Sequence, residues 1–109
     1  MDPAVRKKQL KAARITKDRI VKRYKLRIEK VVRNGPRFYV AKCWMNHLPV
    51  VYKTCLYVNR IDPRTNNGIR REVITLNQFH NNKKTLFSAA TPKIYRSNFK
   101  GRTWYIREY

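Results

Sequence analysis

Positive charge runs through the whole chain, and it constrains the fold more than any other feature of the sequence. Lys and Arg number 27 against 6 Asp and Glu, which gives a net charge of +21 over 109 residues. Residues 1–33 hold 13 basic and 3 acidic side chains, and residues 34–109 hold 14 and 3. A compact chain with this excess repels itself unless a polyanion neutralises it. The composition therefore predicts a partner with dense negative charge, such as nucleic acid.

Apolar content is nevertheless high enough for a folded core. Hydrophobic residues make up 42% of the chain and aromatic residues 12%, whereas disordered chains of high charge are poor in both. The length suits one domain and leaves no room for a second core. We expect residues 34–109 to fold and the first few residues to be loose without a partner.

The N-terminal segment has the features of a basic helix. Asp2 and Pro3 suit a helix start, and residues 4–22 are rich in helix-forming side chains. Its apolar stripe is thin, since it consists only of Leu10, Ala13, Ile20 and Tyr24, and Lys17 interrupts it. Such a helix suits a phosphate-lined groove better than a protein core. We therefore divide the chain into a basic helical arm, residues 1–23, and a small β-rich domain, residues 24–109.

Strand patterns begin where the helix pattern ends. From Tyr24 to Glu29 apolar and charged residues alternate, which predicts a half-buried strand; the alternative is a helix that continues to Val32. A turn at 34–36 and a second strand at 38–44 complete a predicted hairpin.

The remainder of the chain also favours strands. Residues 50–58 are almost wholly β-branched or aromatic, which predicts a central strand. Asp62-Pro63 and Asn66-Asn67-Gly68 predict an exposed loop with Arg64 at its tip, followed by a strand at 72–76. A second loop at 77–84 and short strands at 86–87, 94–95 and 104–106 complete the expectation. The predicted fold is α+β, an N-terminal basic helix followed by a mainly antiparallel sheet of five to seven strands or a small barrel.

Aromatic residues alternate with cations in several segments, as in Arg37-Phe38-Tyr39 and Arg102-Thr103-Trp104-Tyr105. A sheet face with this pattern offers rings that stack on bases and cations that neutralise phosphates. We expect four of the rings in the core, namely Phe38, Trp44, Tyr57 and Phe87. A C-terminal group could serve either as core or as contact surface, and it comprises Tyr95, Phe99, Trp104, Tyr105 and Tyr109.

The candidate nucleic-acid contacts come from the basic helix, the predicted loops and the C-terminal strands. Those on the helix should bind the phosphate backbone and confer affinity without sequence choice. The full candidate set is Arg14, Lys17, Arg19, Lys22, Arg23, Arg37, Arg64, Arg70, Arg71, Lys93, Arg96, Lys100, Arg102, Trp104 and Tyr105.

Catalytic and metal-binding patterns are poor, so we expect neither an enzyme nor a cofactor. His47 and His80 are isolated, and the six carboxylates show no paired or metal-binding spacing. Cys43 and Cys55 lack the spacing of a zinc site and are interpreted as small buried hydrophobes. The enzymatic alternative is a metal-independent ribonuclease that uses His80 with Arg70, Arg71 and a tyrosine.

These features favour a non-enzymatic protein that binds RNA rather than DNA, as a structural subunit of a ribonucleoprotein such as a ribosome. A second alternative is a viral coat or nucleocapsid protein; both readings allow neighbouring protein subunits as partners. A DNA-binding regulator lacks support, because no helix-turn-helix pattern is present. No apolar run approaches the roughly 20 residues of a membrane span. The absence of a signal peptide favours an intracellular, reducing compartment.

Overall fold

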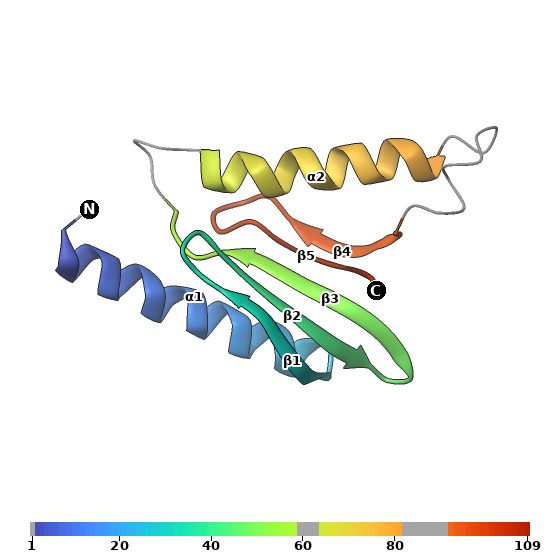
Figure 1. Cartoon of the computed structure of the whole chain (residues 1–109), viewed down its shortest axis with the longest axis horizontal. Helices are drawn as coiled ribbons and strands as arrows, with labels where there is room; N and C mark the ends of the chain where they lie inside the picture. The colour runs from blue at the N-terminus through green and yellow to red at the C-terminus, as the bar shows by residue number, and fades with distance from the viewer. Residues whose placement is uncertain (1, 59–63, 82–91) are drawn as a thin grey trace.

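Two helices and a five-stranded antiparallel sheet make up the fold (Figure 1). The structure is a computed structural model that describes residues 2–58, 64–81 and 92–109, with only the backbone described at 64–67 and 79–81. The sheet has the order β1-β2-β3-β5-β4 and stays open, so α+β is confirmed and the barrel variant is wrong. The elements are α1 (Pro3–Arg23), β1 (Leu26–Asn34), β2 (Phe38–Met45), β3 (Leu48–Cys55), α2 (Arg64–Asn81), β4 (Ile94–Asn98) and β5 (Trp104–Glu108).

Helix α1 starts and stops close to where the sequence predicts. The Asp2 carboxylate accepts a hydrogen bond of 2.7 Å from the Ala4 N–H, and Pro3 occupies the first turn. The helix ends at Arg23, and Lys25 then adopts a left-handed φ of 53°, which breaks the helical path before β1. The alternative in which the helix continues to Val32 is therefore wrong.

The first three strands form two consecutive hairpins, as the sequence predicts for β1 and β2. Gly35 provides the turn between them with a φ of 110°, a conformation that disfavours residues with a Cβ. His47 lies with Asn46 in the turn between β2 and β3. Strand β3 lies between β2 and β5, so the prediction of a central strand is confirmed, although the strand ends at Cys55.

Residues 64–81 are helical, and the prediction of an exposed loop followed by a strand at 72–76 is wrong. Ile69 and Val73 are both buried, and they lie four residues apart on the side of α2 that packs against the sheet. The β-branched residues of this segment resembled a strand, but their spacing places them on one face of a helix. The predicted loop at 77–84 is helical through Asn81, and residues 59–63 and 82–91, including the predicted strand at 86–87, lie outside the described residues.

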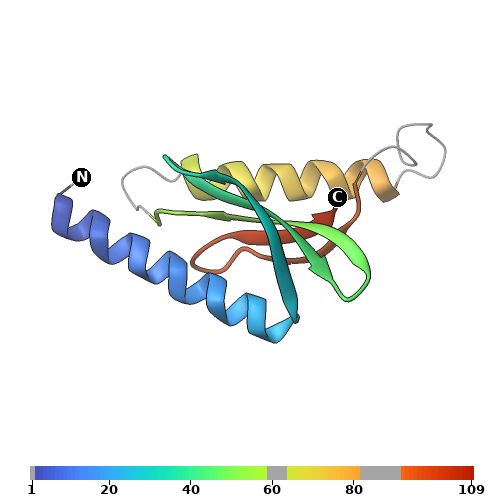
Figure 2. The same ribbon diagram turned by 60° about the horizontal axis from the view of Figure 1, so that its bottom comes forward.

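The two helices cover opposite faces of the sheet (Figure 2). On one face, Ala13 and Ile20 of α1 pack into the larger core cluster with Tyr52 and Trp104. On the other face, Ile69 and Val73 of α2 pack with Cys55 and Tyr105. Neighbouring strand residues such as Trp104 and Tyr105 thus point to different helices, as the pleat of a strand requires. Among the described residues, neither helix is long and apolar enough to cross a membrane.

Candidate nucleic-acid interface

The charged side chains on the solvent-facing side of α1 are almost all basic, although Val5 and Ile15 are exposed among them. Arg14, Arg19, Lys22 and Arg23, the candidate phosphate contacts, are exposed. Within the helix the only carboxylate is that of Asp18, which lies 3.8 Å from the ammonium group of Lys17. An exposed pair at this distance contributes little and cancels one charge at most. The side of α1 that faces away from the sheet is therefore a strongly positive surface.

A basic groove lies between α1 and the turn that joins β4 to β5. Its volume is about 360 Å³, and its lining residues are Thr16, Arg19, Ile20, Arg23, Asn98, Lys100, Arg102 and Trp104. Four of the candidate cations, from two segments about 80 residues apart in the sequence, meet here. No carboxylate occurs among the described residues that line the groove. We call this feature the α1 groove.

The turn that carries Lys100 and Arg102 is held in shape by Asn98. Its amide nitrogen donates to the backbone carbonyl oxygens of Lys100 and Arg102, each at 2.8 Å. These bonds hold the backbone of the turn that carries the two cations. The sequence analysis did not identify Asn98, although an Asn three residues before Gly101 is a common turn signal.

Arg102 connects α1 to the sheet. Its guanidinium donates to the carbonyl oxygen of Cys55 at 2.7 Å and to the backbone and side-chain oxygens of Gln9 at 3.3 and 3.2 Å. Burial lowers the pKa of Arg102 from its usual value, but the acceptors around it retain the charged form. Arg102 therefore supplies a fixed charge to the α1 groove and also stabilises the packing of α1.

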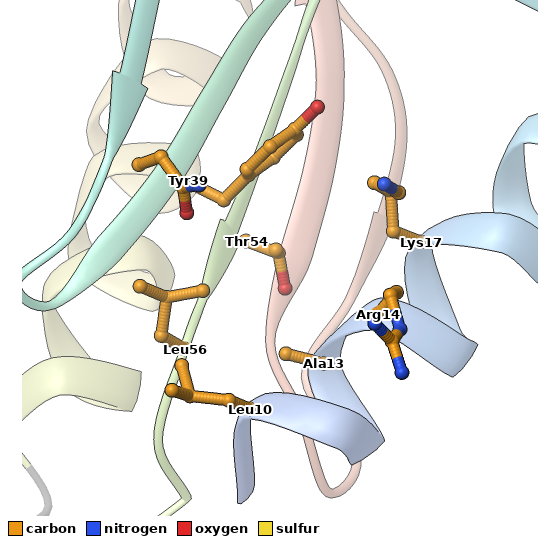
Figure 3. Close-up of a pocket in the computed structure, with 8 residues that line it drawn as sticks. Leu10, Ala13, Arg14, Lys17, Tyr39, Thr54 and Leu56 are labelled. Atoms are coloured by element: carbon orange, nitrogen blue, oxygen red, sulfur yellow. The ribbon is translucent and has the colours of Figure 1, made fainter. Parts of the chain in front are cut away.

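A second hollow lies farther along α1, above β2 and β3 (Figure 3). Its volume is about 240 Å³. Leu10, Ala13 and Leu56 form an apolar end, whereas Arg14 and Lys17 face Tyr39 and Thr54 across the cavity. The Lys17 ammonium lies 5.4 Å from the centroid of the Tyr39 ring. Lys17 interrupts the apolar stripe because it extends over this ring rather than into the core.

The remaining candidate cations are more widely spread. Arg37 is exposed in the turn between β1 and β2, and Arg71 is exposed on α2. Arg70 of α2 lies 5.9 Å from the Phe99 ring, and Lys93 lies 5.9 Å from the Tyr95 ring. Arg96 is exposed and donates to the carbonyl oxygen of Tyr95 at 2.7 Å. The side chain of Arg64 lies outside the described residues, and its backbone belongs to the first turn of α2 rather than to a loop tip.

Trp104 and Tyr105 are core residues and need to be removed from the candidate contact surface. Trp104 is 7% exposed and packs against the rings of Tyr24 and Tyr52 at centroid distances of 6.0 and 6.4 Å. Tyr105 is 1% exposed. Residues 103–106 are all buried because a helix covers each face of the sheet here, and the cations Arg102 and Arg107 lie at the two ends of this buried run. Trp104 nevertheless lines part of the α1 groove.

The other aromatic residues divide between core and surface. Phe38 and Tyr57 are half-buried against the two core clusters, as expected, while Phe87 lies outside the described residues. In the C-terminal group Tyr95 is half-buried, but Phe99 and Tyr109 are 42% and 65% exposed. Trp44 is half-buried but belongs to neither cluster, so the prediction that it lies in the core is wrong.

The part of the chain that the structure describes offers few side chains for metal binding or catalysis. No three His, Cys, Asp or Glu side chains in that part are grouped so that they could hold a metal ion. The side chain of His80, on which the ribonuclease alternative depends, lies outside the described residues. Both cysteine thiols are buried, as predicted.

No family model, curated protein or solved structure matches this chain. Functional conclusions therefore depend on its own residues, above all on those beside α1.

Proposed function

We propose that this chain is a non-enzymatic protein that binds RNA through phosphate contacts in the α1 groove, as a structural subunit of a ribonucleoprotein. The single observation that carries the proposal is the convergence of Arg19, Arg23, Lys100 and Arg102 on one groove with no described carboxylate among its lining residues. Cations that converge on a groove from two segments neutralise a phosphate backbone better than isolated surface charges do.

The distribution of the other charges favours RNA over duplex DNA. Exposed cations lie on α1 on one side of the sheet and on α2 on the other, as with Arg19 and Arg71. A straight duplex contacts one side of a small protein, whereas folded RNA can surround it. Enclosure by RNA would account for the positive charge in both halves of the chain. Contacts to the phosphate backbone do not require the protein to recognise the base sequence.

The experiment compares two triple variants of equal charge. Arg19→Gln, Arg23→Gln and Lys100→Gln together empty the α1 groove of three cations and spare Arg102. If each cation neutralises one phosphate, the slope of log K against log salt should fall by about two to three units. Binding of a labelled RNA hairpin, measured by fluorescence anisotropy over a salt titration, gives this slope.

The matched control is Lys7→Gln, Lys8→Gln and Lys11→Gln, which removes the same charge from exposed positions of the same helix outside the groove. Its slope should fall by less than one unit. Equal decreases of the salt slope in the two variants would show that all exposed charges on α1 contribute alike, and would reject the groove as the site. A wild-type chain that binds no RNA at low salt would reject the function itself.

A further inference from the structure

The face of the sheet opposite α1 is only partly covered. Helix α2 packs mainly on β3, β4 and β5 on that face, and it meets β2 at Phe38, near the start of that strand; Trp44 lies at the opposite end of β2 (Figure 2). Trp44 of β2 points to this side, because its neighbour Cys43 belongs to the core cluster beneath α1. Trp44 packs in neither core cluster; instead, the Lys42 ammonium lies 5.4 Å from the centroid of its ring.

A small hollow lies beside Trp44. Its volume is about 260 Å³, and Arg27, Ile28, Glu29 and Trp44 line it. Arg27 is the direct cross-strand partner of Trp44 in the β1–β2 ladder, so their side chains lie next to each other on the same face. Pockets for drug-sized ligands begin at roughly 300 Å³, so this hollow fits one planar ring system rather than a larger molecule.

A β-bulge directs Glu29 toward the same place. The register of β1 against β2 shifts between Ile28 and Lys30, and the extra residue is Glu29. Its carboxylate accepts from the ammonium of Lys42 at 2.9 Å. Hydrogen bonds from Lys42 and from the Trp44 indole are the main causes that hold the pKa of Glu29 below its usual value. The carboxylate is therefore ionised and fixed beside the ring.

The Glu29 carboxylate argues against a site that binds only phosphate. The chain has 6 acidic residues against 27 basic ones, and a carboxylate beside a nucleic-acid backbone would repel it. A fixed carboxylate next to an aromatic ring instead matches a base, because an ionised carboxylate only accepts hydrogen bonds and can take two parallel ones. Unpaired bases are recognised by stacking on a ring and by hydrogen bonds to their pairing edge.

We propose that the Trp44 hollow binds a single unpaired guanine of the RNA, an inference that rests on the proposed RNA-binding function. The base stacks on Trp44, and the lone pairs of the Glu29 carboxylate that Lys42 and the Trp44 indole leave free accept from its N1–H and its exocyclic amino group. Guanine alone among the four bases presents two adjacent donors on its pairing edge. Adenine and cytosine place one amino group beside an acceptor, and uracil places one N–H between two acceptors. Arg27 lies where it can neutralise the phosphate of that nucleotide.

The test measures binding of the full chain to four short oligouridines whose central nucleotide is G, A, C or U. The oligomer with guanine should bind about tenfold more tightly than the other three. The Glu29→Gln variant should lose this preference. That variant also gains one positive charge, so its affinity for plain oligouridine should stay the same or rise. Its affinity for the oligomer with guanine should fall.

Glu108→Gln is the matched control, since it makes the same change of charge at an exposed position of β5 outside the hollow. It should keep the guanine preference. Equal binding of all four oligomers by the unaltered chain would overturn the inference without any variant. Equal gains for all four oligomers in Glu29→Gln and Glu108→Gln would also overturn it. In either case the chain still binds RNA, so the proposed function stands. If the unaltered chain bound none of the four oligomers, the proposed function itself would be rejected.

Discussion

The Tyr105 hydroxyl donates a hydrogen bond of 2.6 Å to one oxygen of the Glu72 carboxylate, and the Lys53 ammonium lies 2.9 Å from the other oxygen. The three side chains join β5, α2 and β3. Both oxygens of a partly buried carboxylate are thereby satisfied, which removes the main cost of burying it. This network holds α2 on the sheet together with the buried side chains of Ile69 and Val73.

Removal of the Tyr105 hydroxyl should therefore loosen α2. Tyr105→Phe should lower the free energy of unfolding by about 1.5–3 kcal/mol, because a hydrogen bond to a charged group is lost without a replacement. Urea denaturation followed by circular dichroism measures the change. Tyr109→Phe is the control, since Tyr109 is 65% exposed, and it should have little effect. Similar stability of both variants would show that the network does not hold α2.

The orientation of the helix at residues 64–81 can be tested by comparing how much alanine substitutions on its two sides lower the free energy of unfolding. Ile69→Ala should cost about 2–4 kcal/mol, because Ile69 is fully buried against the sheet and its truncation leaves a cavity. Ile74→Ala should cost less than about 1 kcal/mol, because Ile74 is 43% exposed. The same denaturation experiment measures both. A larger cost at Ile74 than at Ile69 would contradict the observed orientation of α2.

Much of this fold could be predicted from local patterns, and α2 could not. The cap at Asp2, the Gly35 turn and the β-branched run of β3 each carry a local physical preference that the fold obeys. In α2 the residues Val73 and Ile74 favour strands locally, and the packing of Ile69 and Val73 against Tyr105 overrides that preference.

The candidate site divides in the same way. Charge on α1 could be read directly from the sequence, because few acidic residues interrupt it. The meeting of Arg23 with Lys100 depends on long-range packing, which no local pattern reveals. Trp104 and Tyr105 were misplaced because interleaved cations mark a strand but do not say what covers each of its faces.

Arg102 should matter for the position of α1 as well as for binding. Its bonds to Cys55 and Gln9 join β3 to the first half of the helix, and Gln9 also exchanges two hydrogen bonds with the backbone of Val58, at 2.9 and 3.2 Å. Arg102→Met should speed hydrogen exchange of the α1 amides near Gln9 and destabilise the protein by about 1–3 kcal/mol. Lys100→Met, at an exposed position, should leave exchange unchanged. Unchanged exchange in Arg102→Met would contradict the connecting role.

The two thiols should be protected in the folded protein. Cys43 and Cys55 are both fully buried, and burial raises the pKa of the Cys43 thiol to about 11 from its usual 9.0. The reactive thiolate of Cys43 should therefore be about 100-fold scarcer near pH 8 than in the unfolded chain, and its reactivity should grow as the pH rises toward the higher value. Labelling with a thiol-specific disulfide reagent should be slow for the native protein and rapid for two thiols in denaturant. Fast native labelling would contradict the packing of the sheet.

The central claim is that this charge exists to meet a polyanion, and the salt dependence of binding tests it most directly. Anisotropy titrations of the unaltered chain with an RNA hairpin, single-stranded RNA and duplex DNA should give a steep slope for all three, with the hairpin retained at the highest salt. A protein that contacts six or more phosphates loses affinity by about 10³-fold or more between about 50 and 200 mM salt, and the RNA hairpin should show this loss. A folded, monomeric chain that ignores all three nucleic acids at the lowest salt would contradict the account.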